Sequence, residues 1–488
     1  MRKSFSKQRR LDSQGVLGVQ LNLECRDEIV PILRALQHIY RHPETRDTIL
    51  DLIASDVNKD SRDDVGREGM DYWQILVLIA VRLGCNLDYD KLQDLAEQHR
   101  TLRHIMGIGD WDVAADFGWR RIRDNICLLK PQTLDTISHL SVELGHVLRP
   151  DAAKQSRADS FVVETNIHWP TESTLIRDGV RKIIELCTAL AKDRKLPGWR
   201  QALHLAKKVK KKARSIDRIS SRKGHNYKHR LKTEYRKLLK QSGTITKRAH
   251  KFLLELESDK QLAANPQVQQ LRVFLQRTQQ VRDTARRRVL QGKNVPNDEK
   301  LFSIFEPHTQ LYKRGKAGEP IQFGRLVLIF EDAAGFITHS YILGRDERDA
   351  DIVVAQTRLV QERLKRAIEY ASFDRGFHTP DNQRQLAEVV KHPCIPKRGI
   401  KQTAEQSQNT SVAFRQARNR HSGIESAIGA LQSGNGLERS RDRTEIGFER
   451  YVNLGILGRN LHVLGKLLIA AEANSSEAAR SKRKKVAA

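Results

Sequence analysis

The chain has 488 residues, which is more than one hydrophobic core supports, so roughly two to four domains are expected. Hydrophobic residues make up 39% of it, enough for a folded protein, while Lys and Arg exceed Asp and Glu by 28 charges. This excess indicates a polyanionic partner, nucleic acid first and a membrane surface second, because Lys and Arg release the counterions condensed on phosphates. The net charge does not restrict which fold the chain can adopt.

The sequence gives no sign of export or membrane insertion. No stretch approaches the roughly 18 apolar residues that a membrane span requires. The N-terminus is basic but lacks the apolar segment of a signal peptide, and five scattered cysteines indicate neither a disulfide framework nor a zinc site. We therefore predict a cytoplasmic, nucleoid-associated prokaryotic protein without a membrane partner.

The first 150 residues predict a basic arm followed by a helical domain. Residues 1–20 are polar and basic, and apolar residues then recur with a helical period. Helices are expected at 29–39, 45–57, 72–83, 89–100, 102–106, 113–129 and 133–148. The short helices and tight turns within 72–107 are compatible with a helix-turn-helix unit and equally with a plain helical bundle. We predict a helical DNA-binding domain over residues 21–150.

The character of the sequence changes at residue 158. The β-branched and aromatic residues of 159–167 predict a strand, and a helix is predicted to follow as far as residue 191. A long basic helical region comes next, typical of a helical hairpin or coiled pair over 227–258 and 266–290. Its opening lysines indicate either a DNA-contacting surface or a solvated helix face, and both interpretations stay open. These lysines are Lys208, Lys210, Lys211 and Lys212.

Strands and helices then alternate towards the C-terminus. A short strand is predicted at 301–305, and a hairpin at 325–331 and 336–343 around the turn 332–335. The remaining elements are predicted as a helix at 349–370, a helix at 381–390, a strand at 394–397, a polar loop at 399–410, helices at 411–432 and 447–472, and a basic disordered tail. This order predicts a mixed α/β sheet.

Three carboxylates stand where this pattern allows chemistry. Asp159 begins the first predicted strand, Asp374 ends a later one before a tight turn at Gly376, and Glu425 lies in a helix after the sheet. Phosphodiester cleavage and transfer use two hard divalent cations with oxygen ligands, which three convergent carboxylates would supply. Each acid also has a structural interpretation: a helix N-cap for Asp374, a solvated helix residue for Glu425, and a strand-end residue for Asp159. Glu164, on the opposite face of the strand, competes with Asp159.

Three blocks in this order resemble those of a known enzyme family. Residues 159–175 (Asp-Ser-Phe-Val-Val-Glu-Thr-Asn-Ile-His-Trp-Pro-Thr-Glu-Ser-Thr-Leu) resemble the first catalytic block of DDE-type insertion-sequence transposases. Residues 373–377 (Phe-Asp-Arg-Gly-Phe) resemble the second block, and 421–428 (His-Ser-Gly-Ile-Glu-Ser-Ala-Ile) the third, with 450–461 as its downstream helix. Residues 72–107 are similar to the N-terminal domain of these proteins. The resemblance covers most of the chain and is greatest to the ISNCY-like group.

The resemblance implies a ribonuclease-H-like catalytic domain with Asp159, Asp374 and Glu425 as ligands of Mg²⁺, for which Mn²⁺ is a substitute. It also implies that basic residues beside these acids contact DNA phosphates near the cut. These residues are Arg375, Arg418, Arg420 and His421. Related groups often have Tyr, Arg and Lys around the Glu, where this chain has Arg418, His421 and Gln432. The predicted divisions are a basic arm (1–20), a helical domain (21–150), a catalytic domain (151–175 and 296–472), a basic helical insertion (176–295) and a disordered tail (473–488).

The favoured hypothesis is a magnesium-dependent transposase acting on double-stranded DNA. It would bind the terminal inverted repeats of an insertion sequence, cleave there, and join 3′-hydroxyl ends to target DNA. A homodimer is expected because two DNA ends must meet. Two alternatives stay open: a non-catalytic, transposase-derived DNA-binding regulator, and a metal-dependent nuclease that releases free ends without strand transfer.

Overall fold

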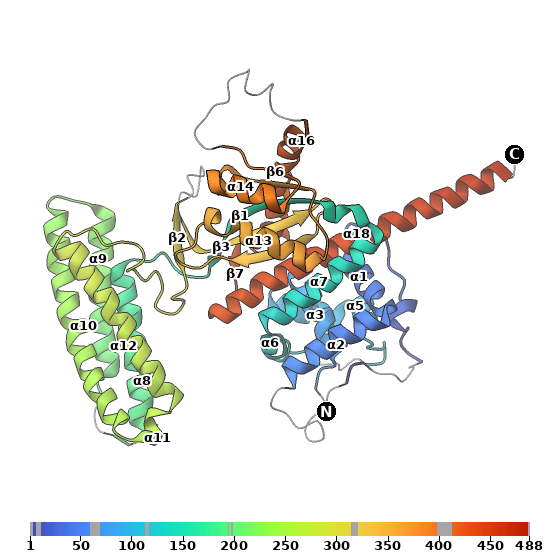
Figure 1. Ribbon diagram of the computed structural model, residues 1–488. Helices are drawn as coiled ribbons and strands as arrows, with labels where there is room; N and C mark the ends of the chain where they lie inside the picture. The colour runs from blue at the N-terminus through green and yellow to red at the C-terminus, as the bar shows by residue number, and fades with distance from the viewer. Residues whose placement is uncertain are drawn as a thin grey trace. The chain divides into compact units, whose positions relative to one another are not determined.

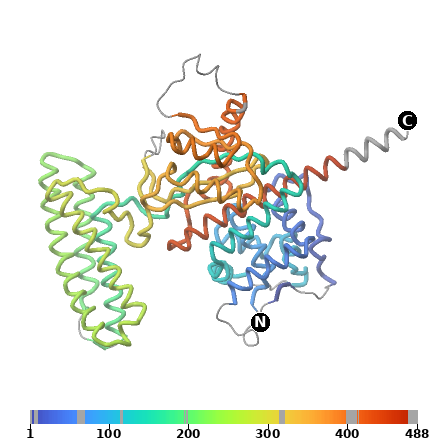
Figure 2. Tube along the Cα trace, viewed as in Figure 1, coloured from blue at the N-terminus to red at the C-terminus, as the bar shows by residue number. Residues whose placement is uncertain are grey.

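The computed structural model of the chain describes residues 3–5, 11–58, 69–112, 117–193, 195–196, 199–313, 321–397 and 412–486, without the side chains of 413 and 476–486. It is a mixed α/β protein made of two compact units (Figures 1 and 2). Unit 1 contains residues 1–166 and 325–488, and unit 2 contains residues 167–324. Unit 2 contains the predicted helical insertion (176–295) but is longer, because it also includes residues 167–175 and 296–324, which were predicted to belong to the catalytic domain.

One open sheet of seven strands has the first strand near its centre. The strands are β1 (Gln155–Thr165), β2 (Gln310–Lys313), β3 (Ile321–Asp332), β4 (Ile337–Ile342), β5 (Tyr370–Phe373), β6 (His392–Cys394) and β7 (Arg439–Ser440). The order is β2–β3–β1–β5–β6, with β4 also paired to β3 and β7 to β1. β1 runs parallel to β5 and β7, β5 parallel to β6, and β3 antiparallel to β2 and β4. The predicted mixed sheet is confirmed.

The predicted hairpin is confirmed, and other strand predictions need correction. β3 and β4 pair around the predicted turn, where Gly335 takes a left-handed φ of +92°. The strand predicted at 301–305 is wrong, because this described segment forms no strand and buries Ile304 in the core of unit 2 instead. β6 lies at 392–394 rather than 394–397.

The bounds around two of the acids also differ from the prediction. β1 begins at Gln155, so Asp159 is its fifth residue and not its first. The helix predicted to reach residue 370 ends at Leu364, because Lys365 takes a left-handed conformation (φ 50°) that stops the helix. The chain is then free to form β5 immediately before Asp374.

The N-terminal helices and the sheet of unit 1 share one core. The helices of this unit are α1 (Ile29–Arg41), α2 (Pro43–Val57), α3 (Tyr72–Gly84), α4 (Tyr89–Gln98), α5 (Arg100–Ile105), α6 (Trp119–Leu128), α7 (Pro131–Leu148), α13 (Asp349–Leu364), α14 (Pro380–Val389), α16 (Val412–His421), α17 (Ile424–Gly429) and α18 (Glu445–Val486). α18 packs along α1, α3 and α7, and one apolar cluster joins these helices to β1 and β3 (Figure 1). Residues 21–150 therefore belong to the same compact unit as most of the sheet, although β2 and the first four residues of β3 fall in unit 2.

α18 is the central helix of this core. Within the described residues it is the one helix long and apolar enough to cross a membrane, over Glu445–Ser475, and 67% of its most apolar window is buried inside the protein. The expectation that no stretch of the chain reaches this length and hydropathy is therefore wrong for α18. Burial of most of this window is typical of a core helix of a folded protein. The tail predicted to be disordered continues α18 as far as Val486.

The helices between residues 72 and 105 resemble a plain bundle more than a DNA-reading motif. Nearly all of α3 is buried, so it cannot enter a DNA groove. α4 exposes Asp90 and Asp94, which phosphates repel, and the exposed Arg100 of α5 is paired with Asp110 at 2.8 Å. This favours the bundle interpretation over a helix-turn-helix. The predicted loop at 399–410 lies outside the described residues.

Unit 2 is a bundle of long helices. They are α8 (Glu172–Asp193), α9 (Ala202–Arg222), α10 (Tyr227–Glu257) and α12 (Pro266–Ala285), with the short α11 (Lys260–Ala263) between the last two and a π-helical turn at Arg286–Leu290 after them. α8 packs on α9, α10 and α12, so the predicted hairpin is part of a four-helix core. Arg282 of α12 is buried and donates to Ser242 Oγ and Thr246 Oγ1 of α10, which gives its N–H groups hydrogen-bond partners inside the bundle.

We predict that Gly458→Ala destabilises unit 1, although alanine normally favours a helix over glycine by about 1 kcal/mol. A Cβ at Gly458 of α18 would lie 2.6 Å from the backbone nitrogen of Gly84 in α3, and backbone cannot move aside. The overpacking should lower the free energy of unfolding by about 2 kcal/mol, measured by urea denaturation. Gly429→Ala is the matched control, since nothing lies within 4 Å of its Cβ position. Equal unfolding midpoints for the two variants would contradict the close α3–α18 crossing.

Candidate active site

Asp159 and Asp374 occupy matching positions on neighbouring strands. β1 and β5 run parallel, and their last recorded pair is Ala158 with Phe373. Asp374 follows with an extended backbone (φ −72°, ψ 164°), so the same register sets it opposite Asp159. Paired residues of adjacent strands, about 4.8 Å apart, direct their side chains to the same face of the sheet. The two carboxylates therefore project from one face.

Asp374 is not the cap of the helix that follows it. Thr379 performs that role, because its hydroxyl accepts a hydrogen bond from the backbone nitrogen of Asn382 at the start of α14 (3.0 Å). Asp374 precedes a 3₁₀ turn, Arg375–Phe377, and makes no capping hydrogen bond to it. The tight turn predicted at Gly376 does form, as the 3₁₀ turn that has this residue at its centre. It does not depend on glycine, because the φ of Gly376 is not positive and a Cβ there would make only an ordinary 3.8 Å contact with Asp374 Oδ2.

The turn between α16 and α17 lies over the same face and brings Glu425 towards it. Arg157 precedes Asp159 by two residues in β1 and so shares its face. Arg157 Nη1 donates to the carbonyl oxygen of Arg420 (3.0 Å), and a Cβ at Gly423 would lie 2.2 Å from the same nitrogen. Glu425 follows in the first turn of α17, with its side chain exposed. All three predicted acids thus belong to this face of the sheet or to the turn that covers it.

His421, at the end of α16, lies between the second and third acids. Its Nδ1 is 3.2 Å from Ser372 Oγ of β5. Burial lowers the pKa of His421 and is the largest effect, while the Asp374 and Glu425 carboxylates raise it and Arg157 lowers it. The imidazole is therefore mainly neutral at pH 7. Both carboxylates therefore lie within electrostatic range of the His421 imidazole.

The oxygen ligands of the three acids suit a hard divalent cation, but their side chains do not yet form a closed metal site. Among the described residues no three His, Cys, Asp or Glu side chains stand close enough to hold a metal ion. The three acids nevertheless offer only carboxylate oxygens, which Mg²⁺ and Mn²⁺ prefer. Asp159 is half-buried, whereas Asp374 and Glu425 are exposed and have room to turn towards a cation. The three acids therefore suit a divalent cation, both because their ligand atoms are carboxylate oxygens and because they lie on one face of the sheet or in the turn that covers it.

The competing acid, Glu164, is used elsewhere. It forms an ion pair with Arg439 of β7, whose Nη2 lies 2.6 Å from Glu164 Oε2. Its position five residues after Asp159 sends its side chain to the opposite face. Strand alternation in the sequence was therefore sufficient to separate these two acids.

Buried charges beside the acids were missed by sequence reasoning. Glu331 of β3 is 2% exposed and is bonded to Arg157 Nε at 2.5 Å. Burial raises the pKa of Glu331, while Arg157 and Arg459 of α18 oppose that rise. Arg157 and Glu331 border a cavity of about 400 Å³ that Arg420 also lines. The sequence signal that could have identified Arg157 is strand alternation, because side chains two residues apart in a strand lie on the same face and Arg157 precedes Asp159 by two.

The four predicted DNA-contacting residues near the acids differ in their availability. Arg375 is exposed directly after Asp374. Arg418 is exposed and lies near Cys394, where its charge opposes the rise in the thiol pKa that burial causes. Arg420 donates from Nη1 to Gln155 Oε1 (2.6 Å) and so is tied to the start of β1. His421 is held by Ser372, as described above.

The predicted lysines belong to unit 2, whereas the acids belong to unit 1. Lys208, Lys210 and Lys211 are exposed on α9. Lys212 is turned inwards and lies 3.5 Å from Glu234 of α10. The basic run therefore consists of three solvent-facing lysines and one that ties two helices together.

Comparisons with known proteins add no family assignment. No protein-family model matches the chain, and searches among curated proteins and solved structures found no match either. Any functional conclusion must therefore depend on the residues and their geometry.

We predict that Asp374→Asn and Glu425→Gln each lower the pKa of His421. Both substitutions remove a negative charge that now favours the imidazolium form. The pKa is measured by NMR titration of the imidazole protons, with the His421 signal assigned by its loss in His421→Gln. Asp381→Asn is the matched control, an exposed acid on α14 that should leave the titration unchanged. An unchanged pKa in either test variant would show that the carboxylate concerned does not face His421.

Proposed function

We propose that the chain is a DDE-type DNA transposase in which Asp159, Asp374 and Glu425 hold the catalytic divalent cations. The observation that supports this best is the register of β1 and β5, which sets two acids side by side while the α16–α17 turn brings the third. A central first strand, with a hairpin on one side and a parallel strand–helix–strand on the other, also agrees with a ribonuclease-H-like domain. The sequence blocks around the three acids agree with the same assignment.

Each residue has a distinct part in the proposed chemistry. Asp159 is fixed by the middle of β1, Asp374 by the end of β5, and Glu425 by the first turn of α17. When bound, the cation pair supplies activation of the attacking water or 3′-hydroxyl and stabilisation of the leaving oxygen. Arg375, exposed next to Asp374, is suited to contact the phosphate that approaches the acids. Joining two DNA ends requires a pair of chains in the DNA complex.

One observation favours the alternative function, a DNA-binding protein that has no catalytic activity. Because no three ligands are gathered among the described residues, a transposase-derived DNA-binding regulator also fits the structure. A nuclease without strand transfer would use the same acids and differ only in its product. The reaction products therefore separate the three functions.

We predict that Asp374→Ala abolishes metal-dependent DNA cleavage while leaving DNA affinity nearly unchanged. The substitution removes a cation ligand and one negative charge, so affinity for the DNA polyanion is unchanged or slightly higher. The substrate is a supercoiled plasmid containing the DNA that flanks the coding sequence, incubated with Mg²⁺ or with EDTA. Nicked, linear and joined products are resolved by electrophoresis, and affinity is measured by fluorescence anisotropy.

Asp381→Ala is the matched control, an exposed aspartate seven positions further on that should cleave like the unmodified chain. Full cleavage by Asp374→Ala, or no metal-dependent cleavage by the unmodified chain, would overturn the proposal. Free ends without joined product would identify the nuclease.

A further inference from the structure

The positive charge of the chain is concentrated in unit 2. Residues 167–324 contain 37 Lys and Arg against 14 Asp and Glu, so they account for +23 of the total charge of +28. Within residues 207–251, which cover most of α9 and α10, there are 18 basic residues and two acids. The candidate acids are in unit 1, so most of the charge expected to attract DNA belongs to a different unit of the chain.

This charge lines a groove between α8 and α9. The groove has a volume of about 710 Å³ and an apolar floor that includes Val180 and Val209. Five basic side chains line it, and Asp178 is the one acid among its lining residues. The basic residues are Arg177, Arg181, Lys207, Lys210 and Arg214.

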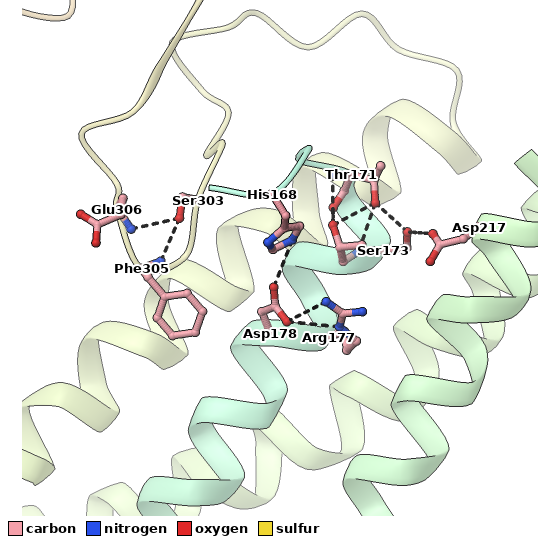
Figure 3. A network of polar contacts seen from close by, with 10 residues as sticks. His168, Thr171, Ser173, Arg177, Asp178, Asp217, Ser303, Phe305 and Glu306 are labelled. Atoms are coloured by element: carbon pink, nitrogen blue, oxygen red, sulfur yellow. Dashed lines mark hydrogen bonds and ion pairs between the residues drawn. The ribbon is translucent and has the colours of Figure 1, made fainter. Parts of the chain in front are cut away.

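The groove cations of α8 are paired with acids, whereas the described groove cations of α9 are not. Asp178 is paired with the groove residue Arg177 at 3.1 Å and with His168 at 3.3 Å (Figure 3), and Arg181 lies 3.9 Å from Glu185. Asp217, the one acid of α9, accepts a hydrogen bond from Ser173 Oγ of α8 at 3.0 Å (Figure 3). The cations of α9 in the groove are exposed, and none of them forms a recorded ion pair in the described part of the chain. The groove therefore retains a net positive charge.

The spacing of these cations suits a phosphate backbone. Lys207, Lys210 and Arg214 follow at intervals of three and four residues, so they lie along one side of α9 over about 10 Å. That distance corresponds to the axial rise of about three phosphates of one DNA strand. Arg177 and Arg181 form a parallel row, one turn apart, on the facing side of α8.

The lining also indicates which polyanion fits. None of the described residues that line the groove is aromatic, whereas proteins that bind single strands stack bases on aromatic rings. The apolar face of α9, which includes Ala213 and Ile216, is buried in the bundle and cannot insert into a membrane. Duplex DNA, which presents phosphates and no unstacked bases, is the remaining match.

We propose that the α8–α9 groove binds the sugar-phosphate backbone of duplex DNA without sequence preference, and that it supplies the main DNA affinity of the chain. The proposal rests on the proposed function in taking DNA as the substrate. It assigns affinity to unit 2 and strand chemistry to unit 1.

The test compares two variants of the full chain with equal loss of charge. Lys207→Gln/Lys210→Gln/Arg214→Gln removes three groove cations, and Lys192→Gln/Lys251→Gln/Lys260→Gln removes three exposed lysines that do not line the groove. Binding to a fluorescent 30-base-pair duplex of arbitrary sequence is measured by anisotropy in EDTA at several salt concentrations. Circular dichroism verifies that both variants keep their helices.

The groove variant should bind at least about tenfold more weakly at 100 mM salt, and its log K against log[salt] slope should become shallower by roughly 2 to 3, because each lost phosphate contact removes about 0.9. The control should change affinity by less than about threefold. Equal losses in both variants would overturn the proposal, since net charge alone would then explain the affinity. Tighter binding of single-stranded DNA, of RNA or of phosphatidylserine vesicles than of the duplex would overturn it as well.

The binding experiment can be interpreted independently of whether the chain is a transposase. Binding is measured without metal, and Asp374→Ala should keep the affinity of the unmodified chain. A chain that binds through the groove but never cleaves would keep this inference and exclude the transposase.

Discussion

The parallel pairing of β1 with β5 is the constraint on which the candidate site depends. Backbone hydrogen bonds between these strands set the register, and the register alone brings together two aspartates that are distant in the chain. Side-chain packing could not do this as well, because Asp374 is exposed and has no core position to hold it. The third acid depends on the same pairing indirectly, since the turn that contains it lies on Arg157 and Ser372, which are themselves paired across these strands.

The helices of unit 1 keep this sheet in place from one side. α18 packs on α1, α3 and α7, and its apolar residues join those of β1 and β3 in a single cluster. The close approach of Gly458 to Gly84 allows α18 and α3 to cross with their backbones nearly in contact. The N-terminal helices thus serve as the support of the sheet, which agrees with the nearly complete burial of α3.

The local sequence pattern was sufficient to predict most helices and the β3–β4 hairpin, because hydrophobic periodicity and turn residues are properties of residues close together in the chain. The merging of residues 21–150 with the sheet was not predictable in this way. α3 is apolar on all sides, and nothing in its own sequence says that its partner is α18. The acids were found from residue type and order, but their common face required the pairing of β1 with β5. Arg157 was overlooked because the strand was predicted to begin only at residue 159, so strand alternation was not applied to it, and its partner Glu331 is far away in sequence.

Arg157 also limits how the third acid can move. One guanidinium neutralises the buried Glu331 and holds the carbonyl of Arg420, at the end of the helix that leads to Glu425. Lifting this turn away from the sheet would break the hydrogen bond between Arg157 Nη1 and the Arg420 carbonyl, and hydrogen bonds to charged groups contribute about 1.5–3 kcal/mol. The backbone of the turn is therefore anchored to a residue of β1 that also compensates the buried Glu331. We expect Glu425 to approach a cation by rotation of its own side chain while this hydrogen bond holds the turn.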